Sequence, residues 1–429
     1  MKILISTGYY NTKKFAGINT GINIAASLQK LGCECVIVGE TYEKSYDDSS
    51  SPVRVIRLNS YPASVANAVN DVYQYLDHNY SGNRRTKLLK YTLRHPLSSI
   101  LIAVSRTGHF NDHLRVKYAR KVERIINQGG FDAVICVCYP FDMSKDILRS
   151  SGIRCCKVYY QLDPYGTNYA LPPEGAMQRK KDEADVMLHS DISITTNELY
   201  EEYSKDPAYQ EAVKKAVPME FPAYFQNEKA EKGPGAVQFN RRKMNLLYCG
   251  TLPGNNVRDT RKAIEVFQKY LESGGNPEAE LYLIGDITNE GILKFAREHE
   301  QAIHILPEVS QAQALATMEA CDFLVNIGNT IPNMVPSKIF TYFATGKPII
   351  SFETSRKSAE NRYFDRYPAK FMIYNEDDSA AAASSLGRFL SESKGRQCDT
   401  EEIRRLYEAN TTDYVAGHML ALIQRSLTR

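Results

Sequence analysis

The sequence predicts an α/β protein built from two doubly wound domains, and three observations support this prediction. The chain has 429 residues, which exceeds one ordinary core at roughly 150 residues per domain. Short apolar runs rich in β-branched residues alternate with stretches of helical periodicity, a pattern typical of parallel sheets covered by helices on both faces. The alternation stops once, over 227–243, where Lys, Glu and a Gly-Pro-Gly run replace it, and then restarts.

The first domain is expected over 1–226. Its first helix is expected over Gly17–Leu31, because apolar residues recur there at helical spacing and Gly32 is a natural helix stop. The strands expected in this domain are Lys2–Thr7, Cys35–Val38, Val53–Leu58, Ala133–Val137, Lys157–Gln161 and Asp191–Thr195.

The second domain is expected over 244–399, after the linker of 227–243. Residues 400–429 read as a pair of amphipathic helices, which are candidates for packing back on the first domain. Ligands of doubly wound sheets bind beyond the carboxyl ends of the strands, so two such sheets predict a cleft between the domains. The elements expected in this domain are a helix over Arg261–Leu271 and strands over Asn245–Cys249, Glu280–Ile284, His304–Leu306, Phe323–Val325 and Pro348–Phe352.

Composition narrows the class of protein. Hydrophobic residues make up 43% and charged residues 24%, the balance of a globular protein, and a net charge of +3 is too small to indicate nucleic acid as a partner. The first residues read as a strand rather than a signal peptide, and no apolar run approaches the roughly 18 residues that cross a bilayer. We therefore expect a cytoplasmic protein whose membrane contact, if any, is peripheral.

The nine cysteines do not predict a metal site or disulfides. Cys33 with Cys35 and Cys136 with Cys138 form C-x-C pairs inside apolar runs, and none of the nine forms the C-x-x-C pairs of a zinc site. Small buried thiols are the expectation, and such thiols persist most easily in a reducing compartment.

The stretch Val335–Ile350 carries the strongest functional signal. Pro336 fixes the approach to a helix, Ser337 can cap its first turn, and Lys338 adds a positive charge there. Free backbone N–H groups and the helix dipole favour an anion at such a helix start, so a phosphate is expected at Ser337, Lys338 and Ile339. An ordinary capped helix with a solvated lysine is the alternative.

The pattern P-S-K-I-F-x-Y-x-A-T-G-K-P-I-I over 336–350 closely resembles the diphosphate-binding segment of retaining GT-B glycosyltransferases, many of which make bacterial polysaccharides and lipid-linked glycans. Residues 246–252 and 281–286 resemble the family's first strand with its glycine turn and its next strand and turn. Residues 303–309 and 320–325 then resemble its nucleobase-reading segment and the strand after it. The resemblance implies two Rossmann-like domains facing across a cleft and a nucleotide-sugar donor in the second. The donor-binding residues that it implies are Gly17, Gly250, Thr251, Lys262, Gly285, Leu306, Pro336, Ser337, Ile339 and Thr341.

The sequence also departs from this family. The family commonly places two glutamates around the helix, where this chain has Asn333 and Thr341, and an arginine where it has Thr251. Arg258 or Lys262 is left to neutralise the diphosphate. These departures leave the donor and the strength of ribose recognition open.

Two residues of the first domain are candidates for the same site. Gly17 lies in the loop of 8–21, where glycine either lets the backbone approach a phosphate or simply begins a helix. Asp163 directly follows a buried strand, with Leu162 where related enzymes often have a histidine. Asp163 either orients an acceptor hydroxyl or holds the turn before Pro164.

Other nucleotide-binding classes fit poorly. Glu40 ends the second strand as a ribose-binding acid would, but no G-x-G-x-x-G precedes it, which argues against an NAD-dependent oxidoreductase. The dipeptide Gly346-Lys347 is not part of a P-loop, and Asp182–Asp185 matches a helicase box in letters only and is expected on a helix surface.

The expected reaction is sugar transfer from a nucleoside-diphosphate sugar, with a UDP-sugar favoured, to a glycan or lipid-linked acceptor in polysaccharide biosynthesis. The candidate catalytic residues are Asp163, Arg258 and Lys338, the last two stabilising the leaving diphosphate. No D-x-D motif stands out, so transfer without a metal or cofactor is expected, and retention of configuration is implied by the resemblance. A non-catalytic nucleotide-sugar-binding partner and a sugar-nucleotide epimerase are the alternatives.

A basic segment over 84–121 holds ten Lys and Arg residues and one acid, Asp112, for a local charge of +9. Leucines, Tyr91 and the apolar run 100–104 interrupt these basic residues. Such a surface can bind anionic lipid head groups, at roughly 1 kcal/mol per basic residue. A solvated helix pair or a protein-contact face is the alternative.

Overall fold

The chain divides into two compact units, each built around its own sheet. The first unit contains residues 1–167, 175–220 and 412–429, and the second contains 168–174 and 221–411. The computed structural model describes residues 1–9, 16–41, 52–58, 108–137, 141–167, 173–222, 235–254, 257–274, 278–331 and 333–428.

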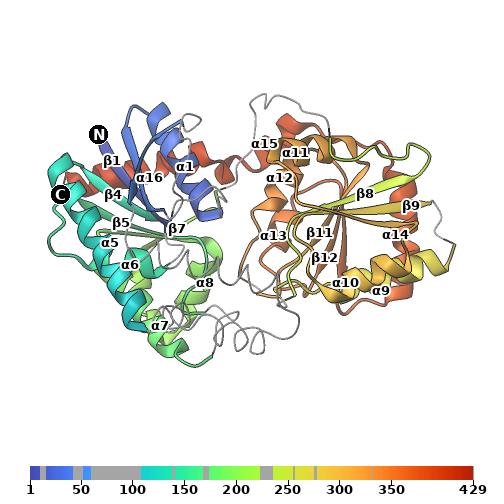
Figure 1. Cartoon of the computed structure of the whole chain (residues 1–429), viewed down its shortest axis with the longest axis horizontal. Coiled ribbons are helices and arrows are strands. Elements are labelled where there is room, and N and C mark those ends of the chain that lie inside the picture. Colours follow the sequence, from blue (N-terminus) through green and yellow to red (C-terminus); the bar gives the residue numbers. More distant parts are fainter. Residues whose placement is uncertain are drawn as a thin grey trace, which may run out of the picture. The chain divides into compact units, whose positions relative to one another are not determined.

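The first unit has a parallel sheet of seven strands in the order β3-β2-β1-β4-β5-β6-β7, with helices on both faces (Figure 1). Successive side chains of β1 point to opposite faces of the sheet and pack into two different hydrophobic cores, because side chains alternate along a strand. Ile3 and Ile5 pack with α1 and α16, whereas Leu4 packs with α5, α6 and α7. The elements are β1 (Lys2–Tyr9), α1 (Ala16–Lys30), β2 (Glu34–Glu40), β3 (Arg54–Leu58), α5 (Gly108–Gly129), β4 (Ala133–Val137), α6 (Phe141–Arg149), β5 (Cys156–Gln161), α7 (Ala176–His189), β6 (Ile192–Thr196), α8 (Asn197–Lys205), β7 (Ala216–Met219) and α16 (Thr412–Leu427).

The second unit repeats this plan with a parallel sheet of six strands in the order β10-β9-β8-β11-β12-β13. Leu246 and Tyr248 of β8 pack with α9, α10 and α14, while Leu247 and Cys249 pack with α12 and α15. The elements are β8 (Met244–Cys249), α9 (Arg261–Glu272), β9 (Ala279–Ile284), α10 (Glu290–Glu298), β10 (Ile303–Leu306), α11 (Gln311–Ala320), β11 (Phe323–Ile327), α12 (Lys338–Ala344), β12 (Ile349–Glu353), α13 (Asn361–Phe364), β13 (Lys370–Tyr374), α14 (Ser379–Ser393) and α15 (Thr400–Leu406).

The predicted α/β class with two doubly wound sheets is confirmed. Every strand predicted from the sequence is present, with bounds that differ by at most two residues. The structure adds two edge strands, β7 and β13, which the sequence did not reveal.

The two terminal helices belong to different units. Helix α15 lies in the second unit beside α12, whereas α16 lies in the first unit and packs along α1. The Ser27 hydroxyl of α1 donates to Asp413 of α16 at 2.5 Å. Residues 400–429 are therefore not one terminal piece, as the sequence analysis treated them.

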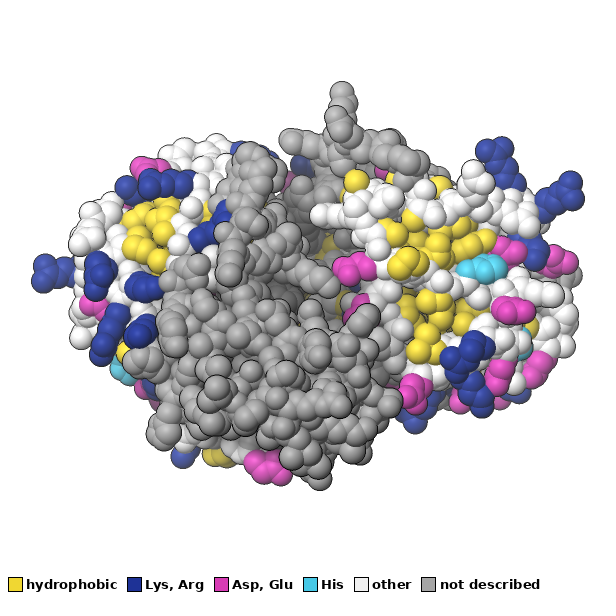
Figure 2. Space-filling model, viewed as in Figure 1, with side chains coloured by type: hydrophobic (Ala, Val, Ile, Leu, Met, Phe, Trp, Pro, Cys, Tyr) yellow, Lys and Arg dark blue, Asp and Glu magenta, His cyan; other side chains and the backbone are white. Residues whose placement is uncertain are grey.

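The described part of the expected linker, 235–243, packs on the second unit. The backbone N–H of Ala236 donates to the Thr317 hydroxyl at 2.8 Å, and the Phe239 ring meets the edge of Tyr282 with centroids 5.0 Å apart. Figure 2 shows side chains of both charge signs on the described surface of each unit. Within the described ranges, no helix has the length and apolar character needed to cross a membrane.

Candidate functional site

The centre of the second sheet is where a doubly wound fold binds ligands. Strands β8 and β11 are neighbours there, and the chain proceeds from them toward opposite edges of the sheet. This arrangement opens a crevice at the carboxyl ends of the two strands. Gly250 follows β8 and Gly328 follows β11.

The turns after β8 and β9 each call for glycine, through their backbone conformation and, at Gly285, through close packing. Gly250 has φ 141° and Gly285 has φ 135°, backbone conformations that other residues rarely adopt. A Cβ atom on Gly285 would lie 2.3 Å from the Gly250 carbonyl oxygen. The two predicted donor-site glycines therefore lie in turns that pack directly against each other.

Lys338 begins α12, and its ammonium is buried. The Nζ atom is shielded from solvent, has no hydrogen-bond partner among the described residues, and lies 3.8 Å from the centroid of the Tyr248 ring. Burial, and then the positive charge of Arg258, lower the pKa of Lys338 well below its ordinary value. The alternative of a solvated lysine is thus wrong.

The side chain of Arg258 lies beside the last residue of β11, and its positive charge acts on Lys338. Its guanidinium donates from Nη1 to the carbonyl oxygen of Ile327, and its backbone forms an antiparallel bridge with Asn329. Two residues that are 80 positions apart in the sequence, Arg258 and Lys338, therefore supply positive charge at the same point of the fold.

Two buried glutamates that the sequence analysis missed lie beside these cations. Glu353 ends β12, Glu360 precedes α13, and each is 1% exposed. Both accept hydrogen bonds from Nδ2 of Asn326, each at 3.2 Å. Burial and the charge of Glu360 raise the pKa of Glu353 to about 9.

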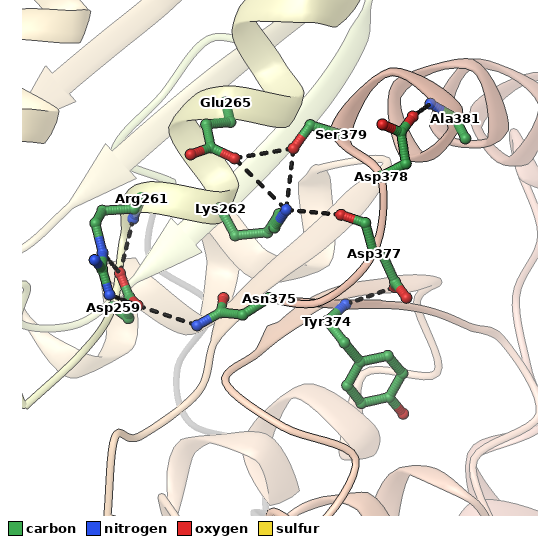
Figure 3. Close-up of polar contacts among 10 residues, drawn as sticks. All are labelled: Asp259, Arg261, Lys262, Glu265, Tyr374, Asn375, Asp377, Asp378, Ser379 and Ala381. Carbon is green, nitrogen blue, oxygen red and sulfur yellow. Dashed lines mark hydrogen bonds and ion pairs between the residues drawn. The ribbon is translucent and has the colours of Figure 1, made fainter.

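Lys262 has a different role from the one expected. Its Nζ donates to the Asp377 carbonyl at 2.8 Å and to the Ser379 hydroxyl at 3.0 Å, and it lies 3.5 Å from Glu265 (Figure 3). These contacts join α9 to the start of α14. They account for the burial of Lys262, so we correct its assignment from a diphosphate ligand to a link between helices.

The start of α12 also differs from expectation in detail. The helix has seven residues, Ser337 makes no side-chain cap, and the backbone N–H of Ile339 donates to the Pro336 carbonyl at 3.2 Å. The N–H of Ile339 is therefore not free for an anion, and its side chain is fully buried. Lys338, rather than the helix end, is the distinguishing feature here.

The remaining donor-site residues predicted from the sequence lie in both units. The Thr251 carbonyl accepts from the Tyr248 hydroxyl at 3.0 Å, which fixes the turn after β8. Thr341 and Leu306 are half-buried on α12 and at the end of β10. Gly17 lies in the first turn of α1 in the first unit, and residues 10–15 of its loop lie outside the described residues.

Asp163 lies just after β5 in the first unit, separated from the strand by Leu162. Burial raises the pKa of its carboxyl to about 6, and its backbone carbonyl accepts from Nε2 of Gln161. The same amide nitrogen donates to the fully buried Glu183 at 2.6 Å, and the Gly166 N–H donates to Glu183 at 3.0 Å. The loop that carries Asp163 is therefore anchored from both sides.

The interpretation of Asp182–Asp185 as a helix surface is wrong for Glu183. Its carboxylate accepts from the hydroxyls of Tyr159, Tyr203 and Tyr209, at 3.2, 2.9 and 2.5 Å. The high tyrosine content is the one signal that could have pointed to such a buried acid. No group of three or more His, Cys, Asp or Glu side chains suited to a metal ion occurs in the described ranges.

Comparison with known proteins places the fold. No protein-family model matches the sequence, and no curated protein sequence matches it. Solved structures do match over nearly the whole chain. A sucrose-phosphate synthase from Thermosynechococcus elongatus has 13% identity and a TM-score of 0.62, with 99% of this chain and 98% of that one covered.

Two further solved structures agree. A UDP-forming α,α-trehalose-phosphate synthase from Burkholderia vietnamiensis has 12% identity and a TM-score of 0.59, with 99% of each chain covered. The catalytic domain of starch synthase IV from Arabidopsis thaliana, bound to ADP and acarbose, has 12% identity and a TM-score of 0.57, with 100% and 99% covered. The chain has the GT-B fold of glycosyltransferases.

Proposed function

We propose that this chain is a glycosyltransferase that moves a sugar from a nucleoside-diphosphate sugar to an acceptor hydroxyl. The observation that carries the proposal is the buried, unpartnered ammonium of Lys338 beside Arg258, at the point of a GT-B sheet where ligands bind. A diphosphate supplies the negative charge that this ammonium lacks. The proposal fits the resemblance of 336–350 to a diphosphate-binding segment.

In the proposed reaction the bond between the sugar's anomeric carbon and the diphosphate breaks, and the acceptor oxygen forms the new bond to that carbon. Charge accumulates on the leaving diphosphate, and Arg258 and Lys338 stabilise it. Asp163 is the acceptor-side group, which orients the hydroxyl that loses its proton. With a pKa of about 6, its carboxyl is largely ionised at neutral pH and can accept that hydroxyl's hydrogen bond, and then its proton as the new bond forms.

A UDP-sugar donor, a glycan or lipid-linked acceptor, retention of configuration and metal-independent transfer belong to the proposal as its finer parts. Among the compared structures, one is named as UDP-forming and another holds ADP, which supports a nucleoside diphosphate in general. The two cationic side chains can neutralise a diphosphate without a metal.

A nucleotide-sugar-binding partner without catalysis is the second candidate. It is favoured by Asn333 and Thr341, where related enzymes commonly have glutamates. The Asn333 amide is shielded from solvent and has no hydrogen-bond partner among the described residues. Donor turnover separates the two candidates, and product analysis separates transfer from epimerisation.

Attachment to an anionic membrane surface through 84–121 is also proposed. Residues 84–107 lie outside the described residues, and 108–121 lie in α5, where Arg115 pairs with Asp146 at 2.6 Å. Sedimentation with anionic vesicles at low salt is the expected result, and failure to sediment contradicts this part.

The central test is thermal unfolding with UDP, GDP, ADP and CMP in parallel, with and without Mg²⁺. A ligand at about 100 times its dissociation constant adds roughly 2.7 kcal/mol of stability. We expect one nucleoside diphosphate to raise the melting temperature, equally with and without Mg²⁺, and the corresponding sugar nucleotide to be consumed with an acceptor. A folded protein that responds to none of them contradicts the proposal.

A further inference from the structure

Two carboxyl groups meet inside the second unit without a full set of donors. The side-chain amide nitrogen of Asn326 donates a hydrogen bond to each, at 3.2 Å to Glu353 Oε1 and at 3.2 Å to Glu360 Oε2. Ser351 also donates to Glu353 Oε1 at 2.6 Å. The other oxygen of Glu353, Oε2, is buried and has no donor among the described residues.

A proton between the two carboxyls resolves this arrangement. Two buried carboxylates in contact repel each other strongly, so one of them retains its proton. Glu353 is the better carrier. Its Oε2 is the carboxyl oxygen without a partner, whereas Glu360 receives the Asn329 N–H at 2.9 Å and faces the positive charges of Arg258 and Lys338. A protonated Oε2 then donates to Glu360 and is no longer unpartnered.

The pair also holds the segment that carries the candidate donor site. Glu360 fixes the backbone of Asn329, Asn329 bridges the backbone of Arg258, and the Asn329 amide donates to the Met334 carbonyl at 2.8 Å. Gly328 leaves room for Glu353, because a Cβ atom on it would lie 2.3 Å from Oε2. The loop between β11 and α12 is thereby tied to the pair.

We propose that Glu353 and Glu360 share one proton and act as a positioning pair, which holds Arg258 and the loop after β11 in the geometry that binds a nucleoside diphosphate. The inference rests on the proposed function for its effect on binding. It adds two positioning residues that touch no ligand and that act through Asn329 and Arg258.

Loss of the shared proton turns the pair into two negative charges beside the diphosphate site. The charged and titratable groups that face the pair in the described structure are Arg258 before α9, Lys338 on α12, Tyr248 on β8 and Tyr374 on β13. A second carboxylate competes with the diphosphate for Arg258 and Lys338. Donor binding is therefore expected to weaken at alkaline pH.

The test compares wild type with Glu353→Gln, whose amide N–H donates to Glu360 as the shared proton does and keeps the pair at one negative charge. The dissociation constant of the nucleoside diphosphate identified by thermal shift is measured across neutral and alkaline pH. We expect Glu353→Gln to bind within about threefold of wild type at neutral pH. Above the titration of the pair, wild type weakens by up to about tenfold per pH unit more than the variant, which shares with wild type only the loss due to deprotonation of Lys338.

Glu376→Gln is the matched control, because Glu376 is solvent-exposed and lies outside the pair. It should follow the wild-type pH profile. An alkaline loss in Glu353→Gln as steep as in wild type overturns the proposal, and so does a large loss of affinity at neutral pH in a folded variant.

Infrared spectroscopy tests the proton without any ligand. The difference spectrum of wild type minus Glu353→Gln should show the C=O stretch of a protonated carboxylic acid at neutral pH, since other protonated carboxyls are common to both proteins. Absence of the band in wild type overturns the shared proton even if Glu353→Gln fails to fold. If wild type binds no nucleoside diphosphate, the proposed function fails, while the band still decides whether the proton is shared.

Discussion

Burial of the Lys338 ammonium lowers the stability of the fold, and a bound diphosphate would offset this loss. An ammonium without hydrogen-bond partners loses its hydration on folding, and the face of Tyr248 compensates only in part. A diphosphate oxygen at Nζ would form a charge-assisted hydrogen bond. An apolar side chain at this position would therefore favour stability, whereas the lysine favours ligand binding.

Replacing Lys338 by Met is expected to lower the affinity for the ligand and to raise the stability of the protein. The variant should lose about 1.5–3 kcal/mol of nucleoside-diphosphate affinity, because a hydrogen bond to a charged group is removed. Its free energy of unfolding should rise by about 1 kcal/mol, because a buried polar group without a partner is replaced by an apolar chain of similar length. Isothermal titration and urea unfolding measure the two effects. A variant that is both less stable and unimpaired in binding would contradict the assignment.

The raised pKa of Glu353 also predicts how stability depends on pH. Its pKa is about 9 in the fold against an ordinary 4.5, so between these values the native state holds a proton that the unfolded state has released. The stability that the Glu353 proton contributes is therefore fully present below about pH 4.5. It is lost as the pH rises through about 9.

Urea unfolding of wild type and Glu353→Gln across this range tests the sign. The stability of the variant minus that of wild type should grow with pH by up to about 1.4 kcal/mol per unit, then level off above the titration. Groups common to both proteins cancel in the difference. A difference that stays flat, or one that falls with pH, would show that Glu353 is ionised in the native state.

Single residues were predictable from the sequence only where a motif marked them. Lys338 and Gly250 stood in segments that resemble known ones, and both lie at the candidate site. Glu183, Glu353 and Glu360 were missed because their partners come from distant parts of the chain. Asn326, for example, is 27 and 34 residues from the two glutamates whose carboxyls it joins.

At the scale of elements, Lys262 stabilises the contact of α9 with the start of α14. Its Nζ satisfies the Asp377 carbonyl and the Ser379 hydroxyl, both shown in Figure 3. The side chain is 9% exposed, so these bonds form largely out of water. Asp378 caps α14 through the Ala381 N–H at 2.8 Å, which places the helix start beside the ammonium.

Replacing Lys262 by Met is expected to lower the free energy of unfolding by about 1–3 kcal/mol, since two polar groups lose a charged donor. Affinity for a nucleoside diphosphate should stay within about twofold of wild type, because the ammonium belongs to a helix junction. The same titration and urea unfolding that serve Lys338→Met measure both, so the two variants control one another. A loss of affinity without a loss of stability would return Lys262 to the donor site.

Elements were predicted well wherever burial was complete. Strands such as β4 and β8 are buried at every position, and their apolar runs predicted them from the sequence. The two missed strands are edges. Strand β7 contains Pro218 and β13 is mostly half-buried, so neither shows the continuous apolar run of a central strand.

At the scale of the whole molecule, the chain leaves its first unit at Phe221 and returns to it with α16, at Thr412. Helix α16 adds Val415, Ala416, Met419 and Ile423 to the core that α1 and the first sheet form. The amphipathic pattern of 400–429 predicted two helices, but it could not assign them to different units. That division depends on which apolar surface each helix covers, and the partner helices lie earlier in the chain, α12 ending at Ala344 and α1 at Lys30.

A chain that ends after Thr411 is therefore expected to lose the first unit and keep the second. The four buried side chains of α16 contribute on the order of 5–8 kcal/mol, which is comparable with the 5–15 kcal/mol that stabilises a typical domain. Hydrogen exchange should rise throughout β1–β7, while β8–β13 stay protected. The truncated chain should still bind the nucleoside diphosphate, because Arg258 and Lys338 lie in the second unit, but it should transfer no sugar. A chain that ends after Leu427 is the control and should match wild type. If β1–β7 remain protected without α16, the first unit has a sufficient core of its own and the role assigned to this helix is wrong.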